Sequence, residues 1–269
     1  MNITLKITCF CICLVVSTHV ISQSGKFQQL VWSDEFNYKG LPDARKWGYD
    51  TGRGCPRNCG WGNNELQYYT VAKKENARVE NGMLVIEARK EKVEEAQYTS
   101  ARLVTKYKGD WVNGRIEVRA KLPSGKGVWP AVWMLPTDWT YGGWPKSGEI
   151  DIMEFVGYLP DSVFGSIHTG TYNWPNNSQK TKGVFLNDLA NAFHVYGIEW
   201  DRESITFTID GKAYLHFSNE YKSAMEWPFD QRFHLILNIA VGGNWGGKYG
   251  VDDGIFPQRM LVDYVRVYQ

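Results

Sequence analysis

The chain has 269 residues, with 30 basic and 29 acidic side chains and a formal net charge of +1 at pH 7. This balance gives no electrostatic argument for a nucleic acid or an anionic membrane as the partner. The length lies in the range where all-β sandwiches and barrels form one domain. We therefore expect one domain that works as a monomer on a neutral partner.

The first 22 residues differ from the rest of the chain. Lys6 precedes the apolar run "ITCFCICLVVSTHVI", and small residues come just before Gln23. This pattern is typical of a secretory signal peptide. The run is short and is interrupted by polar residues, which argues against a membrane span. We expect a signal peptide over 1–22 and a single exported domain over 23–269, released outside the cell or into a periplasm.

Cleavage of the leader leaves two cysteines, Cys55 and Cys59, in the glycine-rich stretch "GRGCPRNCGWG". In an exported protein such a pair forms a small disulfide loop or stays as two free thiols. Zinc binding is the weaker alternative, because no second Cys or His pair lies at ligand spacing.

Short extended segments separated by turns make up the rest of the chain. Asn81-Gly82 and Asp210-Gly211 each separate two such segments and predict tight hairpins. Residues 220–227 predict the one short helix. Further strands are predicted at 30–36, 100–104, 114–121, 131–135, 149–156, 163–168, 193–200, 233–240 and 260–268. Many short strands with frequent turns predict an all-β fold, an antiparallel β-sandwich or jelly roll.

The stretch "GEIDIMEFVG" at 148–157 does not fit a regular strand. Strict alternation would place Glu149 and Asp151 on one face and Glu154 on the other, among apolar side chains. An unpaired buried carboxylate is costly. A β-bulge at Ile152 or Met153 would return Glu154 to the face of the other two acids. An edge strand with a solvated acidic face is the alternative.

Aromatic residues surround this acidic segment. Trp129, Trp133 and Trp144 precede it, and Trp245 lies in the glycine-rich run "VGGNWGGKYG". Tryptophan is more often a core residue than a ligand contact. Near two carboxylates, however, flat rings also suit the stacking of sugars, and carboxyl groups about 5 to 5.5 Å apart are what a retaining glycosidase requires. Trp245 between glycines is the hardest of the four to explain as packing.

Several segments together resemble a known family. They are "GVWPAVWMLP", "GEIDIMEF", "GSIHTG", "WSDEF", "NNELQYYT", "FHVYGIEW", "LILNIAVGGNW" and "VDYVRVYQ". The chain is similar over essentially its whole length after the leader to the laminarinase type of glycoside hydrolase family 16, the endo-β-1,3-glucanases. The resemblance implies a β-jelly roll with a glycan cleft on its concave face and retaining hydrolysis of β-1,3-glucan.

The resemblance also implies roles for the acids. Glu149 matches the nucleophile, Asp151 the assisting residue and Glu154 the acid and base, with Met153 as the extra residue of the bulge. Two nearby carboxyls with different pKa values would suit this division of labour.

The remaining candidates have competing explanations. Asn64 and Arg102 match hydrogen-bonding positions on the glycone side of the family's cleft, but either also suits a turn or a surface charge. His168 is expected to contact Asp151 or sugar, or to be a satisfied core histidine.

No cofactor is expected for catalysis. A structural calcium on the convex face is implied by the resemblance, with Glu35, the backbone oxygen of Gly82 and Asp263 as ligands. Two rivals stay open: a non-catalytic β-glucan-binding protein, and an enzyme of the same fold that cleaves mixed-linkage glucan, agar or carrageenan. No Lys/Arg cluster accompanies the aromatic segments, which disfavours sulfated polymers.

Overall fold

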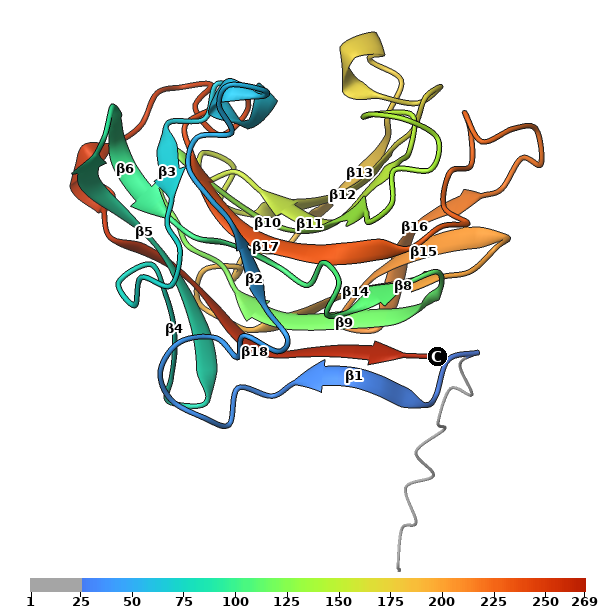
Figure 1. The fold of residues 1–269 in the computed structure, drawn as a ribbon, viewed down its shortest axis with the longest axis horizontal. Helices are drawn as coiled ribbons and strands as arrows, with labels where there is room; N and C mark the ends of the chain where they lie inside the picture. Colours follow the sequence, from blue (N-terminus) through green and yellow to red (C-terminus); the bar gives the residue numbers. More distant parts are fainter. Residues whose placement is uncertain (1–25) are drawn as a thin grey trace, which may run out of the picture.

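The computed structural model describes residues 26–269. The predicted signal peptide therefore lies outside the described residues. Two large sheets stack on each other, and loops rise from the smaller sheet, whose outer face is concave (Figure 1). The prediction of an all-β, antiparallel sandwich is confirmed.

The larger sheet has ten strands, and only the β3–β6 pair in it is parallel. Its main order is β16-β15-β14-β9-β18-β5-β6-β3, with β1 added beside β18 and β4 beside β5. The strands are β1 (Leu30–Asp34), β3 (Gln67–Tyr69), β4 (Ala77–Glu80), β5 (Met83–Val93), β6 (Ala96–Ser100), β9 (Gly114–Lys121), β14 (His194–Trp200), β15 (Ser204–Ile209), β16 (Lys212–Ser218) and β18 (Gln258–Tyr268).

The smaller sheet has eight strands in the order β13-β12-β11-β10-β17-β7-β2, with β8 beside β17. They are β2 (Gly48–Asp50), β7 (Arg102–Val104), β8 (Asp110–Trp111), β10 (Val128–Pro136), β11 (Glu149–Phe155), β12 (Ser162–His168), β13 (Lys180–Phe185) and β17 (Phe233–Val241). Three short 3₁₀ helices lie in loops: η1 (Cys59–Gly62), η2 (Trp174–Asn176) and η3 (Asp253–Ile255). No helix among residues 26–269 is long and apolar enough to cross a membrane.

The space between the sheets holds one continuous hydrophobic core. On β11, Ile150, Ile152 and Met153 are buried in it, and the larger sheet contributes side chains such as Trp200 and Phe207. Burying large apolar side chains is the main favourable contribution to such a fold. The inward face of β11 is therefore tied to the core, and its outward face is free to carry polar groups.

Most of the strands agree with the prediction. Both hairpins form as expected, and Asn81, Gly82, Asp210 and Gly211 all have positive φ angles between 50° and 74°. This is the conformation of a tight I′-type hairpin turn. The predicted strands 114–121, 163–168 and 233–240 match β9, β12 and β17 within one residue at each end.

The predicted helix over 220–227 is wrong. Trp227 N donates to the oxygen of Ser223, which closes a single turn. A segment this short does not form a stable helix by itself, and Pro228 disfavours the helical conformation of the residue before it. β13 was not predicted, because its exposed edge position gives no regular apolar alternation.

Candidate active site

The β-bulge in β11 is present. Ala131 on β10 pairs with Glu154, and Trp133 on β10 pairs with Asp151. One residue lies between Ala131 and Trp133 on β10, but two residues lie between Asp151 and Glu154 on β11. Partners on neighbouring strands share a face, and Ala131 and Trp133 share a face of the regular strand β10. The two residues of the bulge, Ile152 and Met153, lie opposite the single residue Val132, and both of their side chains enter the core. The three acids therefore line the outer, concave face.

Two tryptophans each hold one of the outer acids. Trp129 Nε1 donates to Glu154 Oε1 at 3.1 Å, and Trp144 Nε1 donates to Glu149 Oε2 at 2.9 Å. Both indoles come from the aromatic segment predicted to bind substrate. Because each N–H is used by a carboxylate, each ring is fixed in orientation beside the acid, with its faces left for packing or ligand contact.

Asp151 lies between these acids, and His168 lies across the strand from Glu149. His168 Nε2 is 3.4 Å from Asp151 Oδ2 and 3.8 Å from Glu149 Oε1, and its ring also packs 5.9 Å from that of Trp144. The contact expected between His168 and Asp151 is present. His168 is buried, but its Nδ1 has no partner among the described residues. It is therefore not a fully satisfied core histidine.

The pKa values of all three carboxyl groups are raised. For Glu149 and Glu154 burial is the main cause, repulsion from Asp151 adds to it, and the indole hydrogen bonds act in the opposite direction. Burial also raises the pKa of Asp151, and a hydrogen bond with Glu149 lowers it. Three acids this close cannot all be ionised at neutral pH without large cost, so the cluster retains protons.

The three residues Glu149, Asp151 and His168 also form the one group in residues 26–269 whose ligand atoms approach as a metal site would, within 4.8 Å of one another. A pair of carboxyl groups on one face is also the arrangement that acid–base chemistry on a glycosidic bond requires, and that chemistry needs no metal.

Beside the acids, an arginine lies between two tryptophan rings. The Arg102 guanidinium carbon is 4.4 Å from the centre of the Trp61 ring and 4.7 Å from that of Trp133. Arg102 is buried and pairs with Asp50 at 2.9 Å. The surface-charge alternative for Arg102 is therefore wrong, because stacking and pairing hold it in the wall of the concave face.

Asn64 and Trp245 meet the same face from loops. Asn64 Nδ2 donates to Asn244 Oδ1 at 2.8 Å, which joins the loop before β3 to the glycine-rich loop after β17. Asn64 has a positive φ of 57°, so its turn role holds as well. The Trp245 ring lies 5.6 Å from Trp129 and 5.2 Å from Phe164, edge to face. Trp245 therefore extends the aromatic wall that begins at Trp129.

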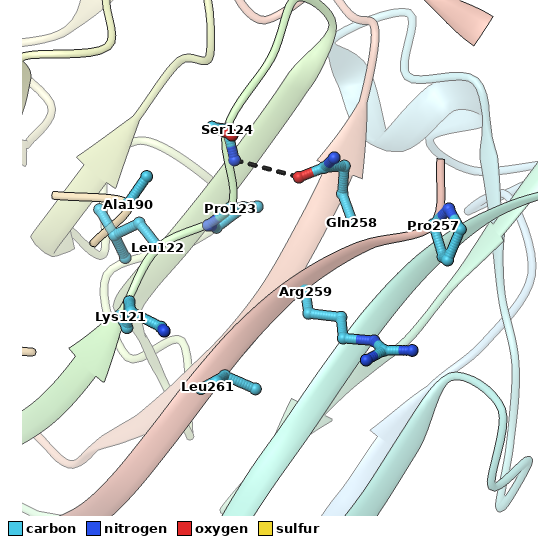
Figure 2. Close-up of a pocket in the computed structure, with 9 residues that line it drawn as sticks. All are labelled: Lys121, Leu122, Pro123, Ser124, Ala190, Pro257, Gln258, Arg259 and Leu261. Carbon is cyan, nitrogen blue, oxygen red and sulfur yellow. Dashed lines mark hydrogen bonds between the residues drawn. The ribbon is translucent and has the colours of Figure 1, made fainter. Parts of the chain in front are cut away.

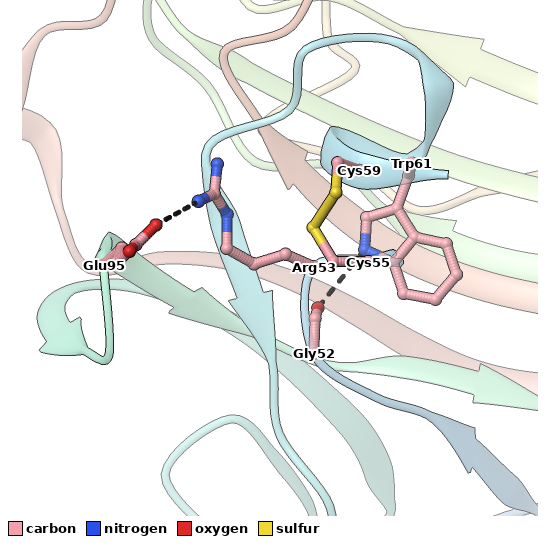
Figure 3. Close-up of a disulfide and its surroundings, with 6 residues drawn as sticks. All are labelled: Gly52, Arg53, Cys55, Cys59, Trp61 and Glu95. Atoms are coloured by element: carbon pink, nitrogen blue, oxygen red, sulfur yellow. Dashed lines mark hydrogen bonds and ion pairs between the residues drawn. A yellow bond between two sulfur atoms is a disulfide. The ribbon is translucent and has the colours of Figure 1, made fainter. Parts of the chain in front are cut away.

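The two cysteines form a disulfide, Cys55–Cys59, in the loop that carries η1. Figure 3 shows this loop beside Trp61, whose Nε1 donates to the oxygen of Gly52 at 3.3 Å. Arg53 reaches Glu95 in the loop between β5 and β6 at 3.7 Å. The loop thus holds Trp61 in place over Arg102.

The residues named for calcium lie on the other sheet. β1 pairs with residues 265–268 of β18 and β5 pairs with residues 258–262, so Glu35, Gly82 and Asp263 flank the same stretch. Both Glu35 oxygens, however, accept hydrogen bonds from Arg266 at 2.8 and 2.7 Å, and Arg119 pairs with Asp263 at 2.5 Å. Calcium takes six to eight oxygen ligands and would have to displace these arginines, so the carboxylates as arranged do not fit it.

An open pocket of ≈ 440 Å³ also lies away from the acids, between the ends of β9 and β18 (Figure 2). Its lining contains no carboxylate and no aromatic ring, and Arg259 there is paired with Glu87. We assign it no part in the chemistry of the acids.

Sequence reasoning missed four residues that form or support the wall of the concave face: Trp61, Glu65, Tyr69 and Asn238. Glu65 and Tyr69 lie in "NNELQYYT" and Asn238 in "LILNIAVGGNW", segments that indicated the family but gave these positions no role. For Asn238 the usable signal was a polar residue within the apolar run "LILNIAV", since buried polar groups require partners.

Comparison with known proteins agrees with this geometry. Residues 64–266 match the family model described as glycosyl hydrolases family 16. The chain belongs to glycoside hydrolase family 16.

Within family 16, the chain is 54% identical over 255 residues to a β-glucanase from Rhodothermus marinus, covering 92% of this chain and 87% of that protein. It matches the structure of the laminarinase from Rhodothermus marinus with a TM-score of 0.86 and 54% identity, covering 90% and 97% of the two chains. A non-specific endo-β-1,3(4)-glucanase of the same family matches with a TM-score of 0.84 and 49% identity, covering 90% and 91%.

Proposed function

We propose that this protein is an endo-β-1,3-glucanase that hydrolyses internal β-1,3-glucosidic bonds of laminarin-like glucans with retention of configuration. The observation that carries the proposal is the bulge in β11, which brings Glu149, Asp151 and Glu154 onto one concave face, with an indole N–H on each outer acid. The relatives named above support the substrate class.

In the first step Glu149, as the carboxylate, attacks the anomeric carbon. The bond to the leaving glucosyl oxygen breaks, and Glu154 gives that oxygen its proton. The product is a glycosyl-enzyme ester on Glu149 and an ionised Glu154. Burial raises the pKa of Glu154 as it raises that of Glu149, so the cluster retains protons at neutral pH, and the mechanism assigns one of them to Glu154 and none to Glu149.

In the second step Glu154 takes a proton from water, and the hydroxide oxygen attacks the anomeric carbon. The ester bond breaks and Glu149 leaves as a carboxylate, while Glu154 is protonated again. Asp151 hydrogen-bonds Glu149 and adjusts its pKa, and His168 borders both. Transglycosylation follows when a sugar hydroxyl replaces the water.

Substrate binding falls to the aromatic wall and its polar neighbours. We assign the glycone side to Asn64, Arg102 and Trp133, and sugar stacking near the acids to Trp129, Trp144 and Trp245. Flat ring faces suit the C–H faces of glucose, and Arg102, buried between two rings, offers fixed donors to hydroxyl groups.

The test is incubation with laminarin, with new reducing ends measured over time and the first-formed anomer followed by NMR. The proposal expects internal cleavage and a β-anomer as the initial product. Binding of laminarin without new reducing ends would mean a non-catalytic β-glucan-binding protein. An α-anomer as initial product would overturn the retaining mechanism.

Mixed-linkage glucan is a second candidate substrate, because a relative of 49% identity is a non-specific endo-β-1,3(4)-glucanase. Comparing kcat/KM on laminarin, lichenan, agarose and carrageenan separates these substrates. The proposal expects laminarin to lead and the two galactans to give no products.

Secretion is part of the proposal. The leader pattern supports export, and the Cys55–Cys59 disulfide suits an oxidising compartment. N-terminal sequencing of the exported protein is expected to begin at Gln23. Because Arg266 and Arg119 occupy the carboxylates of Glu35 and Asp263, calcium is expected to leave the melting temperature unchanged in a titration. A rise in melting temperature that Asp263→Asn abolishes would show that calcium displaces these arginines and binds at Glu35, Gly82 and Asp263.

A further inference from the structure

A buried glutamate with no role in the reaction lies behind the arginine–tryptophan stack. Glu65 is 6% exposed and follows Asn64 in the loop that leads from the disulfide to β3. Its N–H donates to the oxygen of Gly60 at 3.0 Å, and the neighbouring Leu66 N–H donates to the oxygen of Val241 at 2.9 Å. The backbone at Glu65 is therefore fixed between the disulfide loop and the end of β17.

The side chain of Glu65 receives hydrogen bonds from three directions. Gln67 Nε2 donates to Oε2 at 2.7 Å, the Tyr69 hydroxyl donates to Oε2 at 3.4 Å, and Asn63 Nδ2 donates to Oε1 at 3.4 Å. Gln67 is itself fixed, because its Oε1 accepts from the N–H of Val241 at 2.7 Å. Both oxygens of Glu65 thus act only as acceptors, which is the pattern of an ionised carboxylate.

A chain of donors connects Glu65 to the cleft. Trp133 Nε1 donates to Asn238 Oδ1 at 2.7 Å, Asn238 Nδ2 donates to the Tyr69 hydroxyl at 3.0 Å, and Tyr69 donates to Glu65. Every link runs in the same direction, and the carboxylate is the terminal acceptor. Tyr69 is completely buried and Asn238 is buried, so no solvent replaces a missing partner.

The direction of this chain determines what Trp133 presents to the cleft. With its N–H used by Asn238, Trp133 offers a ring face, and Arg102 stacks on that ring at 4.7 Å. Burial raises the pKa of Glu65, and the hydrogen bond from Gln67 and the positive charge of Arg102 act in the opposite direction, in favour of the carboxylate. Glu65 therefore interacts with both Trp133 and Arg102 from the buried side of the wall and does not reach the cleft itself.

We propose that Glu65 is a positioning residue, whose carboxylate orients Asn238 and Trp133 through Tyr69 and holds Arg102, and so sets substrate affinity on the glycone side. This inference rests on the proposed function. It predicts that a break in the hydrogen-bond chain from Trp133 to Glu65 weakens substrate binding. The chemical step is expected to stay intact, because neither Glu149 nor Glu154 belongs to this hydrogen-bond chain.

Glu65→Gln tests the proposal with almost no change in volume. A glutamine keeps one acceptor, so its NH₂ group must face either the donors of Gln67 and Tyr69 or the donor of Asn63, and the negative charge opposite Arg102 is lost in both orientations. We expect KM for laminari-oligosaccharides to rise by about 10-fold with kcat within about two-fold, the mark of lost uniform binding. An unchanged KM in the folded variant overturns the proposal.

Tyr69→Phe provides the same test without altering charge, and it carries the test if Glu65→Gln does not fold. It removes only the hydroxyl link, and we expect KM to rise by about three-fold. In a double-mutant cycle, Glu65→Gln is expected to cost less on a Trp133→Phe background, where no indole N–H remains to orient. Additive effects there would overturn the coupling through the chain.

Glu87→Gln is the matched control. Glu87 is also a buried carboxylate, but it lies on β5 of the larger sheet among arginines. We expect a lower melting temperature with unchanged KM. A rise in KM for Glu87→Gln as large as that for Glu65→Gln would reduce the Glu65 effect to general destabilisation. Absence of laminarin hydrolysis by the wild-type protein would instead refute the proposed function, so the two failures are distinguishable.

Discussion

Buried carboxylates on the two sheets have opposite kinds of neighbours. On the larger sheet, Glu87 is surrounded by Arg78, Arg89 and Arg259. On the smaller sheet, Asp151 is equally buried, and its neighbours are Glu149, Glu154 and His168. Among the described residues, no lysine or arginine forms an ion pair with any of these three acids.

The difference separates a structural from a chemical use of the same functional group. Arginines around Glu87 compensate the cost of burying its carboxylate, and their ion pairs with Glu87 hold neighbouring strands together. Around Asp151, in the part of the chain that the structure describes, no lysine or arginine compensates the cost of burying a carboxylate. The cluster therefore retains protons, which it can transfer in a reaction. The concave sheet therefore gives up stability for reactivity, which is a common relation in enzymes.

The largest expected effect is on Glu149. Glu149→Ser removes the attacking carboxylate, and we expect kcat on laminarin to fall on the order of 10⁴-fold or more, with oligosaccharide binding retained. Reducing-end assays and isothermal titration calorimetry measure the two quantities. Activity within ten-fold of wild type would contradict the assignment of the nucleophile.

Glu154→Gln comes next. Loss of the acid and base is expected to reduce kcat by about 10² to 10⁴-fold. The variant also lacks the fall in kcat/KM that wild type is expected to show as alkaline pH removes the raised-pKa proton. Sodium azide should restore turnover and yield the β-glycosyl azide, because it attacks the intermediate without base help. An α-azide product would exchange the roles of Glu149 and Glu154.

A pair of neutralising substitutions tests the comparison directly. Glu87→Gln leaves three arginines without their common partner and is expected to lower the free energy of unfolding by about 2 kcal/mol, since these arginines are partly solvated. Asp151→Asn removes a carboxyl group that the unfolded chain ionises at pH 7 but that burial disfavours as a charge in the native state, and it is expected to raise the free energy of unfolding by about 1 kcal/mol while reducing kcat. Urea unfolding at pH 7 measures both. The same sign for both variants would contradict the contrast between the sheets.

A pH dependence of stability is also expected. Burial raises the carboxyl pKa values of the cluster, that of Asp151 to about 8, so the native state keeps protons that the unfolded chain releases above about pH 4 to 5. The free energy of unfolding should therefore fall as pH rises from about 5 to 8, by about 1 to 3 kcal/mol. Urea unfolding at several pH values is expected to give a shallower slope for Asp151→Asn. Equal slopes would show that other groups dominate.

Much of the fold was predictable because local signals and burial agree. The Asn-Gly and Asp-Gly turns dictate their hairpins, and alternating segments such as 114–121 bury one face. The helix at 220–227 failed because a weak local pattern was overridden by the turn closed by Ser223 and Trp227. β13 and the three-residue strands β2 and β3 form by pairing with distant partners, which no local window contains.

The site was predictable where residues lie close in sequence and obscure where they converge from afar. Glu149, Asp151 and Glu154 share one strand, so counting faces was enough to predict the bulge. The Trp61–Arg102–Trp133 stack and the Glu65–Tyr69–Asn238 chain draw on segments far apart in the chain, and only the fold shows that they meet.

The bulge in β11 also bears on how related sequences are compared. In a regular strand, residues four apart share a face, and here residues five apart do so because one position is absorbed by the backbone. The number of residues between two acids in the sequence therefore does not predict the distance between their carboxyl groups. An insertion of one residue at Met153 can be silent for the chemistry, whereas one beyond the bulge would reverse every side chain after it.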